Sequence, residues 1–186
     1  MHSRRSGFAR VPLRSGRGQS TGRARLFSSA RGFTLVEIMV TITIISILVA
    51  ILVPTMVKIK RRSLATAISN DVRVFAAAFE AYAHEAGRWP NEVDAGVFPP
   101  EMASRINDGT WTRRSPIGGM YNWDSDQMHQ GTRYKGVIAI SSTASAPLTQ
   151  DVDLWEAIDK VIDDGVLTSG NFRIGTDDEP IFIVAQ

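Results

Sequence analysis

The longest apolar segment of the chain runs from Ile38 to Val57 and contains twenty residues without a charge. As an α-helix rising about 1.5 Å per residue it would span roughly 30 Å, the thickness of the hydrocarbon core of a bilayer. Its polar members are threonine and serine, whose hydroxyl groups can donate to carbonyls of the same helix. The segment is therefore predicted to cross a membrane as one helix.

A second periodic segment, Lys58 to Ala86, follows without proline or glycine. Its apolar residues recur at spacings of three and four, which predicts an amphipathic helix packed on the protein's own sheet. This stripe comprises Ile59, Leu64, Ile68, Val72, Phe75, Phe79 and Tyr82. Gly87 is placed as a C-terminal cap, and Pro90 prevents easy continuation. Pro54 lacks an N–H and crowds the carbonyl of Ala50, so it is predicted to kink or loosen the long helix.

The rest of the chain predicts a small mixed domain. Residues 91–114 read as a long surface connection with at most a short helix near residues 100–106, because Gly, Pro and polar residues alternate there without a period. Short strands are predicted at residues 119–123, 134–141, 171–174 and 180–185, with a bulge at Gly136 and a helix over residues 152–162 that Gly165 ends. A long helix on a small, mostly antiparallel sheet is an α+β fold.

One carboxylate, Glu37, stands at the start of the apolar segment. In hydrocarbon it would cost several kcal/mol unless it reached the interface or found a positive partner. The plain interpretation places Glu37 at headgroup level, one turn into the helix, where it also favours the positive end of the helix dipole.

The formal net charge of +2 hides a strong asymmetry along the chain. The segment before Phe33 holds eight of the 21 basic residues, all arginine, and no acidic residue. The remainder has 13 basic against 19 acidic residues, a net charge of −6. The basic character therefore gives no ground for a nucleic-acid partner.

This Arg-rich and Ser-rich leader has rival interpretations. Its composition resembles a mitochondrial transit peptide, and Ser3-Arg4-Arg5 resembles a twin-arginine signal without the apolar region close behind it. A secretory signal is disfavoured, because its apolar region is only about 7–15 residues and precedes a small-residue cleavage site. Eight arginines before the apolar helix, against four basic residues at positions 58–62 after it, predict a cytoplasmic N-terminus.

The junction Gly32-Phe33-Thr34-Leu35-Val36-Glu37, between a basic leader and an apolar helix, resembles the processing site of type IV prepilins and pseudopilins. The resemblance implies that a prepilin peptidase cuts after Gly32, that the Phe33 amine is methylated, and that Glu37 becomes the fifth mature residue. Pro54 falls about where family members carry a kinking proline. In the family this Glu is thought to face the N-terminal ammonium of a neighbouring subunit, so Glu37 would fix the register of assembly.

The resemblance also implies an organisation and a location. A leader, residues 1–32, is removed; residues 33–57 are the membrane-spanning half of the helix, residues 58–87 its amphipathic half, and residues 88–186 a small α+β head of pilin-like fold. The chain would be a single-pass protein of the bacterial inner membrane with a periplasmic head, later extracted into a periplasmic filament. Its partners would be further copies of itself, other pilin-like subunits, the prepilin peptidase and methylase, and an inner-membrane assembly platform.

Three function classes follow. The first is a type II secretion pseudopilin that polymerises to support protein export. The chain has no Cys; many type IV pilins close a C-terminal loop with a Cys pair, which type II secretion pseudopilins commonly lack. Gly87-Arg88-Trp89-Pro90 also resembles the turn after the long helix of major pseudopilins. The alternative is a type IV pilus subunit for adhesion, motility or DNA uptake. The third class is an unrelated single-span protein with a periplasmic binding head.

Catalytic chemistry is not indicated by the sequence. It has no Cys nucleophile, no Gly-rich phosphate loop and no pair of histidines at zinc-binding spacing. The histidines are His2 in the leader, His84 near a helix end and His129 in a predicted polar loop. The sequence indicates no acidic residue that would orient any of them in a Ser-His-Asp site. The chain is predicted not to be an enzyme.

No cofactor is predicted, with calcium as the open alternative. Two acidic clusters could contribute ligands, Asp124 with Asp126 and the run Asp177-Asp178-Glu179. Calcium requires six to eight oxygen ligands, so the plain interpretation is solvated turn residues. Major pseudopilins carry a calcium site in their C-terminal loops, but the Gly-rich acidic loop of that site is not recognisable here.

Overall fold

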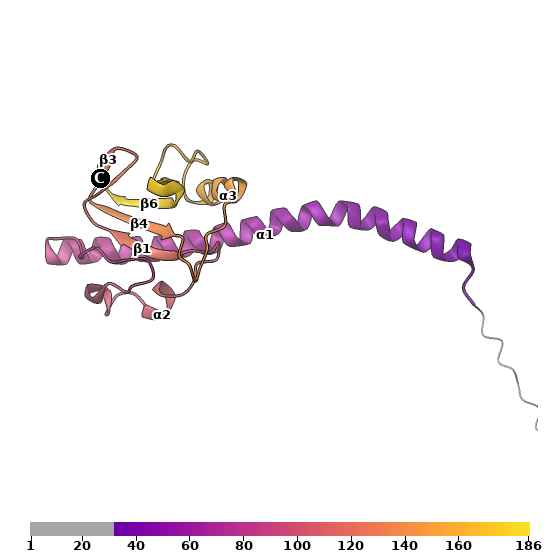
Figure 1. The fold of residues 1–186 in the computed structure, drawn as a ribbon, viewed down its shortest axis with the longest axis horizontal. Helices are drawn as coiled ribbons and strands as arrows, with labels where there is room; N and C mark the ends of the chain where they lie inside the picture. The colour runs from indigo at the N-terminus through magenta and orange to yellow at the C-terminus, as the bar shows by residue number, and fades with distance from the viewer. Residues whose placement is uncertain (1–31) are drawn as a thin grey trace, which may run out of the picture. The chain divides into compact units, whose positions relative to one another are not determined.

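The computed structural model describes residues 32–186, and the predictions for the leader, residues 1–31, lie outside this range. The chain divides into two compact units, residues 1–43 and 44–186. In chain order the elements are α1 (Leu35–Ala86), η1 (Pro100–Met102), α2 (Asp108–Trp111), β1 (Met120–Asp124), β2 (Gln127–His129), β3 (Thr132–Tyr134), β4 (Gly136–Ser141), α3 (Val152–Ile162), β5 (Phe172–Ile174), η2 (Thr176–Asp178) and β6 (Pro180–Ala185) (Figure 1).

The apolar segment is helical and fully exposed. Every residue from position 32 to position 60 is exposed, and among the described helices α1 is long and apolar enough to cross a membrane. The hydroxyl of Thr41 donates to the Glu37 carbonyl at 2.8 Å, and that of Thr43 to the Met39 carbonyl at 2.7 Å. These bonds satisfy hydroxyl groups that could find no partner in hydrocarbon. Pro54 lies inside α1, and a kink there stays a prediction.

The predicted amphipathic stripe is confirmed over the part of α1 that the sheet covers. The buried residues of α1 are Ala65, Ile68, Ser69, Val72, Phe75, Ala76 and Phe79. Leu64 and Tyr82, at the two ends of this stripe, are half-buried. The prediction is wrong for Ile59, which is 60% exposed, because burial on α1 begins only beyond it. Gly87, with φ of 67°, donates its N–H to the Ala83 carbonyl and ends the helix as predicted.

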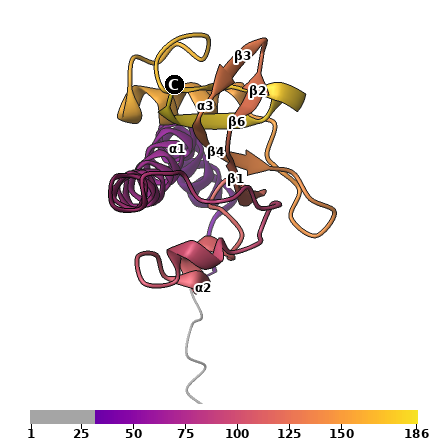
Figure 2. The ribbon, with the colours of Figure 1, turned by 90° about the vertical axis from the view of Figure 1, so that its left-hand side faces the viewer.

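A four-stranded antiparallel sheet, in the order β1-β4-β6-β5, packs on α1 (Figures 1 and 2). Side chains of β4 alternate between its two faces. Ile138 and Ile140 join the core that contains the buried stripe of α1 and the apolar face of α3. Val137 and Ala139 face the other side, where Tyr134 of β3 covers them. The α+β arrangement is confirmed, with both α1 and α3 contributing to one side of the sheet.

Aromatic rings fill the space between α1 and the sheet. Phe79 stacks on Trp123 of β1 with ring centroids 3.8 Å apart, and Phe75 meets Trp111 and Tyr121 edge-on, each at 4.9 Å. The position of Trp111 corrects the prediction that residues 91–114 form a surface connection. This segment contains α2 and inserts three buried side chains into the core, those of Met102, Ile106 and Trp111.

The small hairpin β2–β3 was not predicted. Its strands are three residues long, mostly polar, and joined by Gln130-Gly131, whose positive φ values of 49° and 80° suit a tight hairpin turn. Tyr134, predicted to start the next strand, instead ends β3. The bulge at Gly136 is confirmed by a register shift between Gly136 and Val137, and a Cβ at Gly136 would lie 2.6 Å from the Trp123 ring.

The remaining predicted elements are confirmed within a residue or two. Helix α3 spans the predicted range, and Asp151 caps it by accepting a hydrogen bond from the Leu154 N–H at 3.1 Å. Strands β5 and β6 occupy the last two predicted ranges.

Candidate processing and assembly site

The start of α1 is set by Thr34. Its side-chain hydroxyl oxygen accepts a hydrogen bond from the Glu37 N–H at 3.1 Å, and its carbonyl accepts one from the Ile38 N–H at 3.2 Å. Thr34 and Glu37 have the Thr-x-x-Glu spacing of a capping box, in which the hydroxyl satisfies an orphan donor of the first turn. The Thr-x-x-Glu spacing is present in the sequence, although Thr34 is not among the predicted site residues. Residues 32–34 therefore lie outside the helix.

The predicted cleavage junction is open on every side within the described part of the chain. Phe33 is 76% exposed, and a Cβ added at Gly32 would have no heavy atom within 4 Å. Packing within the described chain therefore gives no reason for glycine at position 32. The described fold thus sets no requirement for a small residue at this position.

Glu37 lies in the first turn of α1 and is exposed. Its position favours an acidic side chain, because the unsatisfied N–H groups of the first turn carry partial positive charge. No other residue of the described range 32–186 forms a hydrogen bond or ion pair with its carboxylate. The carboxylate is therefore placed to meet water, lipid headgroups or a group of another chain.

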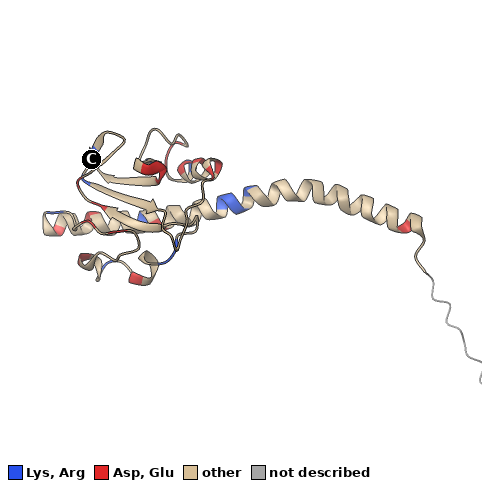
Figure 3. Cartoon of the chain, in the orientation of Figure 1, with Lys and Arg blue, Asp and Glu red and all other residues tan. Residues whose placement is uncertain are grey.

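A basic cluster follows the apolar segment on α1, at Lys58, Lys60, Arg61 and Arg62 (Figure 3). Arg61 alone among these is half-buried, and it forms ion pairs with Asp151 at 3.2 Å and with Asp153 at 2.9 Å. The hydrogen bond that Arg61 donates to Asp153 is the main cause that raises the pKa of Arg61. Both acids lie at the start of α3, so Arg61 joins α1 to α3 beside the apolar segment.

Three of the five residues considered for calcium, Asp124, Asp126 and Glu179, have other partners. Asp124 lies 3.3 Å from Nε2 of His129, whereas Asp126 pairs with Arg133 at 2.9 Å. In the second cluster, Glu179 accepts a hydrogen bond from the Ser142 N–H at 2.6 Å. Over residues 32–186, no three His, Asp or Glu side chains are grouped so that they could hold a metal ion.

His129 was predicted to lie in a polar loop, and this is wrong. It belongs to β2 and is only 8% exposed, because the hairpin folds against the segment that contains Thr176. The Thr176 N–H points at Nδ1 of His129 at 3.5 Å. His84 is exposed at the end of α1, as its position near a helix terminus predicts.

Comparison with protein families identifies the N-terminal region. Residues 27–53 match the family model described as the prokaryotic N-terminal methylation motif. The match includes Gly32, Phe33 and Glu37 and most of the apolar segment. These are the residues predicted to form the cleavage and assembly site.

Two characterised proteins resemble longer parts of the chain. The type II secretion system core protein G of Klebsiella michiganensis is 31% identical over 110 residues, which cover 54% of this chain and 78% of that protein. The type IV major pilin protein PilA of Myxococcus xanthus is 32% identical over 75 residues, covering 40% of this chain and 34% of the pilin. The match therefore spans about a third of the pilin but more than three quarters of the secretion protein. No solved structure matches the chain at a significant level.

Proposed function

Because the chain belongs to the family of type IV pilins and type II secretion pseudopilins, we propose that it is a structural subunit of a helical pseudopilus that supports protein export. One observation carries the proposal: an exposed apolar helix starts directly behind a Gly32–Phe33 junction and bears a single carboxylate, Glu37, in its first turn. An apolar helix exposed in this way must be covered by lipid or by other subunits. Assembly from the membrane into a filament would replace the lipid around the apolar helix with other subunits.

The first step would be removal of the leader by a prepilin peptidase, which cuts between Gly32 and Phe33 and methylates the new amine. The exposure of Phe33 and the open space around Gly32 support this step, because an enzyme must reach the peptide bond. A glycine would be required by the enzyme rather than by the substrate's own fold.

The second step would be assembly, in which Glu37 pairs with the N-terminal ammonium of a neighbouring subunit. The lack of a partner for this carboxylate within the described chain supports the proposal. Two opposite charges attract more strongly in an apolar filament core than in water, although both lose their hydration. The pair would act as a register device, because a misplaced subunit would bury an unpaired charge.

The proposed role also defines location and partners. The protein would be anchored by one span in the bacterial inner membrane, with its N-terminus cytoplasmic before cleavage and its head in the periplasm, until it is extracted into the filament. It would contact further copies of itself, other pilin-like subunits and an inner-membrane assembly platform. This role requires no catalysis and no cofactor, and we propose neither for the chain.

A type IV pilus subunit for adhesion, motility or DNA uptake is the second candidate, favoured by the similarity to the Myxococcus pilin. Deletion of the gene separates the two roles. Loss of an exported protein from the medium with normal surface motility supports the pseudopilus, and the reverse result supports the pilus.

The experiment that tests the family role is the intact mass of the protein extracted from membranes. We expect the mass of residues 33–186 plus one methyl group. Gly32→Leu should leave the leader attached without disturbing the fold, because no described atom lies near this position. A wild-type chain that still begins at Met1 in cells with an active prepilin peptidase would overturn the proposal and favour an unrelated single-span protein.

A further inference from the structure

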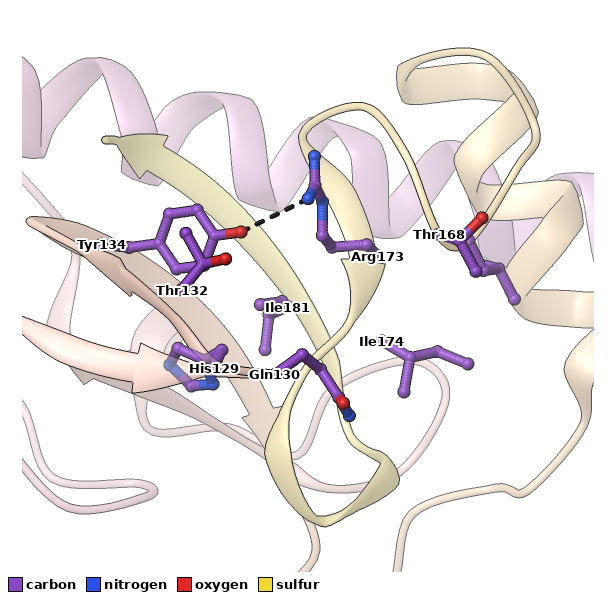
Figure 4. A pocket seen from close by; sticks show the side chains of 9 residues that line it. His129, Gln130, Thr132, Tyr134, Thr168, Arg173, Ile174 and Ile181 are labelled. Carbon is purple, nitrogen blue, oxygen red and sulfur yellow. Dashed lines mark hydrogen bonds between the residues drawn. The ribbon is translucent and has the colours of Figure 1, made fainter.

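A cavity of about 420 Å³ lies at the β5 edge of the sheet, between the β2–β3 hairpin and β5 (Figure 4). Its apolar floor includes Ile174 and Ile181, and its polar lining includes Tyr134, Thr168 and Arg173. The volume falls in the range of small-ligand pockets, and the combination of an apolar floor with a few polar groups is typical of them.

Arg173 is the charged group of this cavity that lacks an opposite charge. Its Nε and Nη2 both donate to the Gly170 carbonyl, and its Nη1 donates to the Tyr134 hydroxyl at 3.3 Å. Both acceptors are neutral, and within residues 32–186 Arg173 forms no ion pair. Figure 4 shows the Tyr134 hydroxyl pointing toward the guanidinium group.

Counting donors shows what the guanidinium can still bind. An arginine side chain has five N–H donors, of which three are used here, so one remains on each of Nη1 and Nη2. A carboxylate is the group best matched to a partly desolvated guanidinium, because it offers two oxygen acceptors and the missing negative charge. The bonds to Gly170 and Tyr134 hold the guanidinium in place before any ligand arrives, which lowers the entropy lost on binding.

We propose that this cavity binds a carboxylate carried by an apolar group. The carboxylate would pair with Arg173, and the apolar group would lie on Ile174 and Ile181. Two sources share this chemistry, a free small organic acid and the C-terminal residue of a polypeptide. The site is separate from the N-terminal helix, so it does not depend on the proposed role in assembly.

The test uses the full chain in neutral detergent micelles and para-fluorophenylacetate as a probe followed by fluorine NMR. We expect saturable binding of the acid and none of its amide, para-fluorophenylacetamide, a comparison that leaves the protein unchanged. Arg173→Gln should weaken binding about tenfold to a hundredfold, and Arg173→Lys less, because lysine keeps the charge without the planar fork. Arg133→Gln is the matched control, since Arg133 is an exposed residue of β3 that pairs with Asp126 outside the cavity.

Competition identifies the source of the carboxylate. Displacement of the probe by a short neutral peptide with a free C-terminus, but not by its amidated form, supports a polypeptide end. Displacement by benzoate but by neither peptide supports a free acid. Absence of saturable binding, equal binding of the acid and its amide, or unchanged binding in Arg173→Gln would overturn the proposal.

Discussion

Asp159 in α3 is expected to weaken the head at neutral pH, and Asp159→Asn tests this. The residue is completely buried, and neither carboxylate oxygen has a hydrogen-bond partner in the described chain. Burial, with smaller contributions from the negative charges of Asp164 and Asp163, raises the pKa of Asp159 to about 6. The neighbouring Asp164 remains ionised, because hydrogen bonds from the Ser169 hydroxyl and the Val166 N–H lower its pKa.

The sign and size of the effect follow from proton linkage. An aspartate in the unfolded chain has a pKa near 3.9, so the folded state holds its proton to a higher pH. The contribution of Asp159 to the unfolding free energy is therefore fully present below about pH 4 and is lost as the pH rises through about 6. A difference of about two pKa units corresponds to about 3 kcal/mol in total, and to about 2 kcal/mol between about pH 4.5 and pH 7.5.

Asp159→Asn removes the pH dependence that Asp159 gives to the unfolding free energy. Burying the amide has its own free-energy cost, but this cost is the same at every pH, because an amide does not titrate. Relative to wild type, the unfolding free energy of the variant should rise by about 2 kcal/mol from about pH 4.5 to pH 7.5. Urea unfolding of the full chain in micelles, followed by tryptophan fluorescence, measures it, since Trp111, Trp123 and Trp155 are buried in the head. Glu156→Gln, on the same helix and half-buried, controls for the change in net charge. Parallel pH profiles of wild type and Asp159→Asn would refute the reasoning.

Three further predictions concern assembly, the core and metal binding. Glu37→Gln should leave cleavage and membrane insertion intact but nearly abolish fibres in sheared cell fractions, because a neighbour's buried ammonium without a counter-charge costs on the order of 3–5 kcal/mol; a normal fibre yield would return Glu37 to an interfacial role. Phe79→Ala should lower the unfolding free energy by about 3–5 kcal/mol, because it removes the ring stacked on Trp123. The control Val74→Ala, at an exposed position of α1, should lower it by under about 1 kcal/mol in the same urea titration. Calcium in place of a chelator should leave the thermal midpoint of the head unchanged, and a rise of several degrees would contradict the proposal that the chain needs no cofactor.

The elements that the sequence predicts well are those whose burial repeats along the chain. The covered part of α1 and the helix α3 bury a residue every three or four positions, so their apolar pattern records the fold directly. The hairpin β2–β3 leaves no such record, because its six strand residues are mostly polar and only Tyr134 covers the sheet. Contacts far apart in sequence are equally invisible, such as the pairing of Arg61 with Asp151 across 90 positions.

The candidate site residues likewise fall into those that could be predicted from the sequence and those that could not. Gly32, Phe33 and Glu37 could be named from the sequence because they form a local motif within a short stretch of the chain. Thr34 could have been named from its spacing to Glu37, and only the hydrogen bond in the structure shows that it caps the helix. The cavity at Arg173 could not be predicted, because its walls come from segments that meet only when the hairpin folds over the sheet.

The cap at Thr34 has a consequence for the proposed cleavage. A peptide bond inside a helix has its N–H and C=O groups engaged along the helix axis, so a peptidase cannot lay it out as an extended substrate. The hydroxyl of Thr34 caps the helix, which begins at Leu35. The peptide bond between Gly32 and Phe33 therefore lies outside the helix, with only the Phe33–Thr34 bond between it and the capping residue. The start of the helix thus determines which peptide bonds next to it remain non-helical and open to cleavage. A substitution that let the helix begin earlier would protect this bond without altering either residue that forms it.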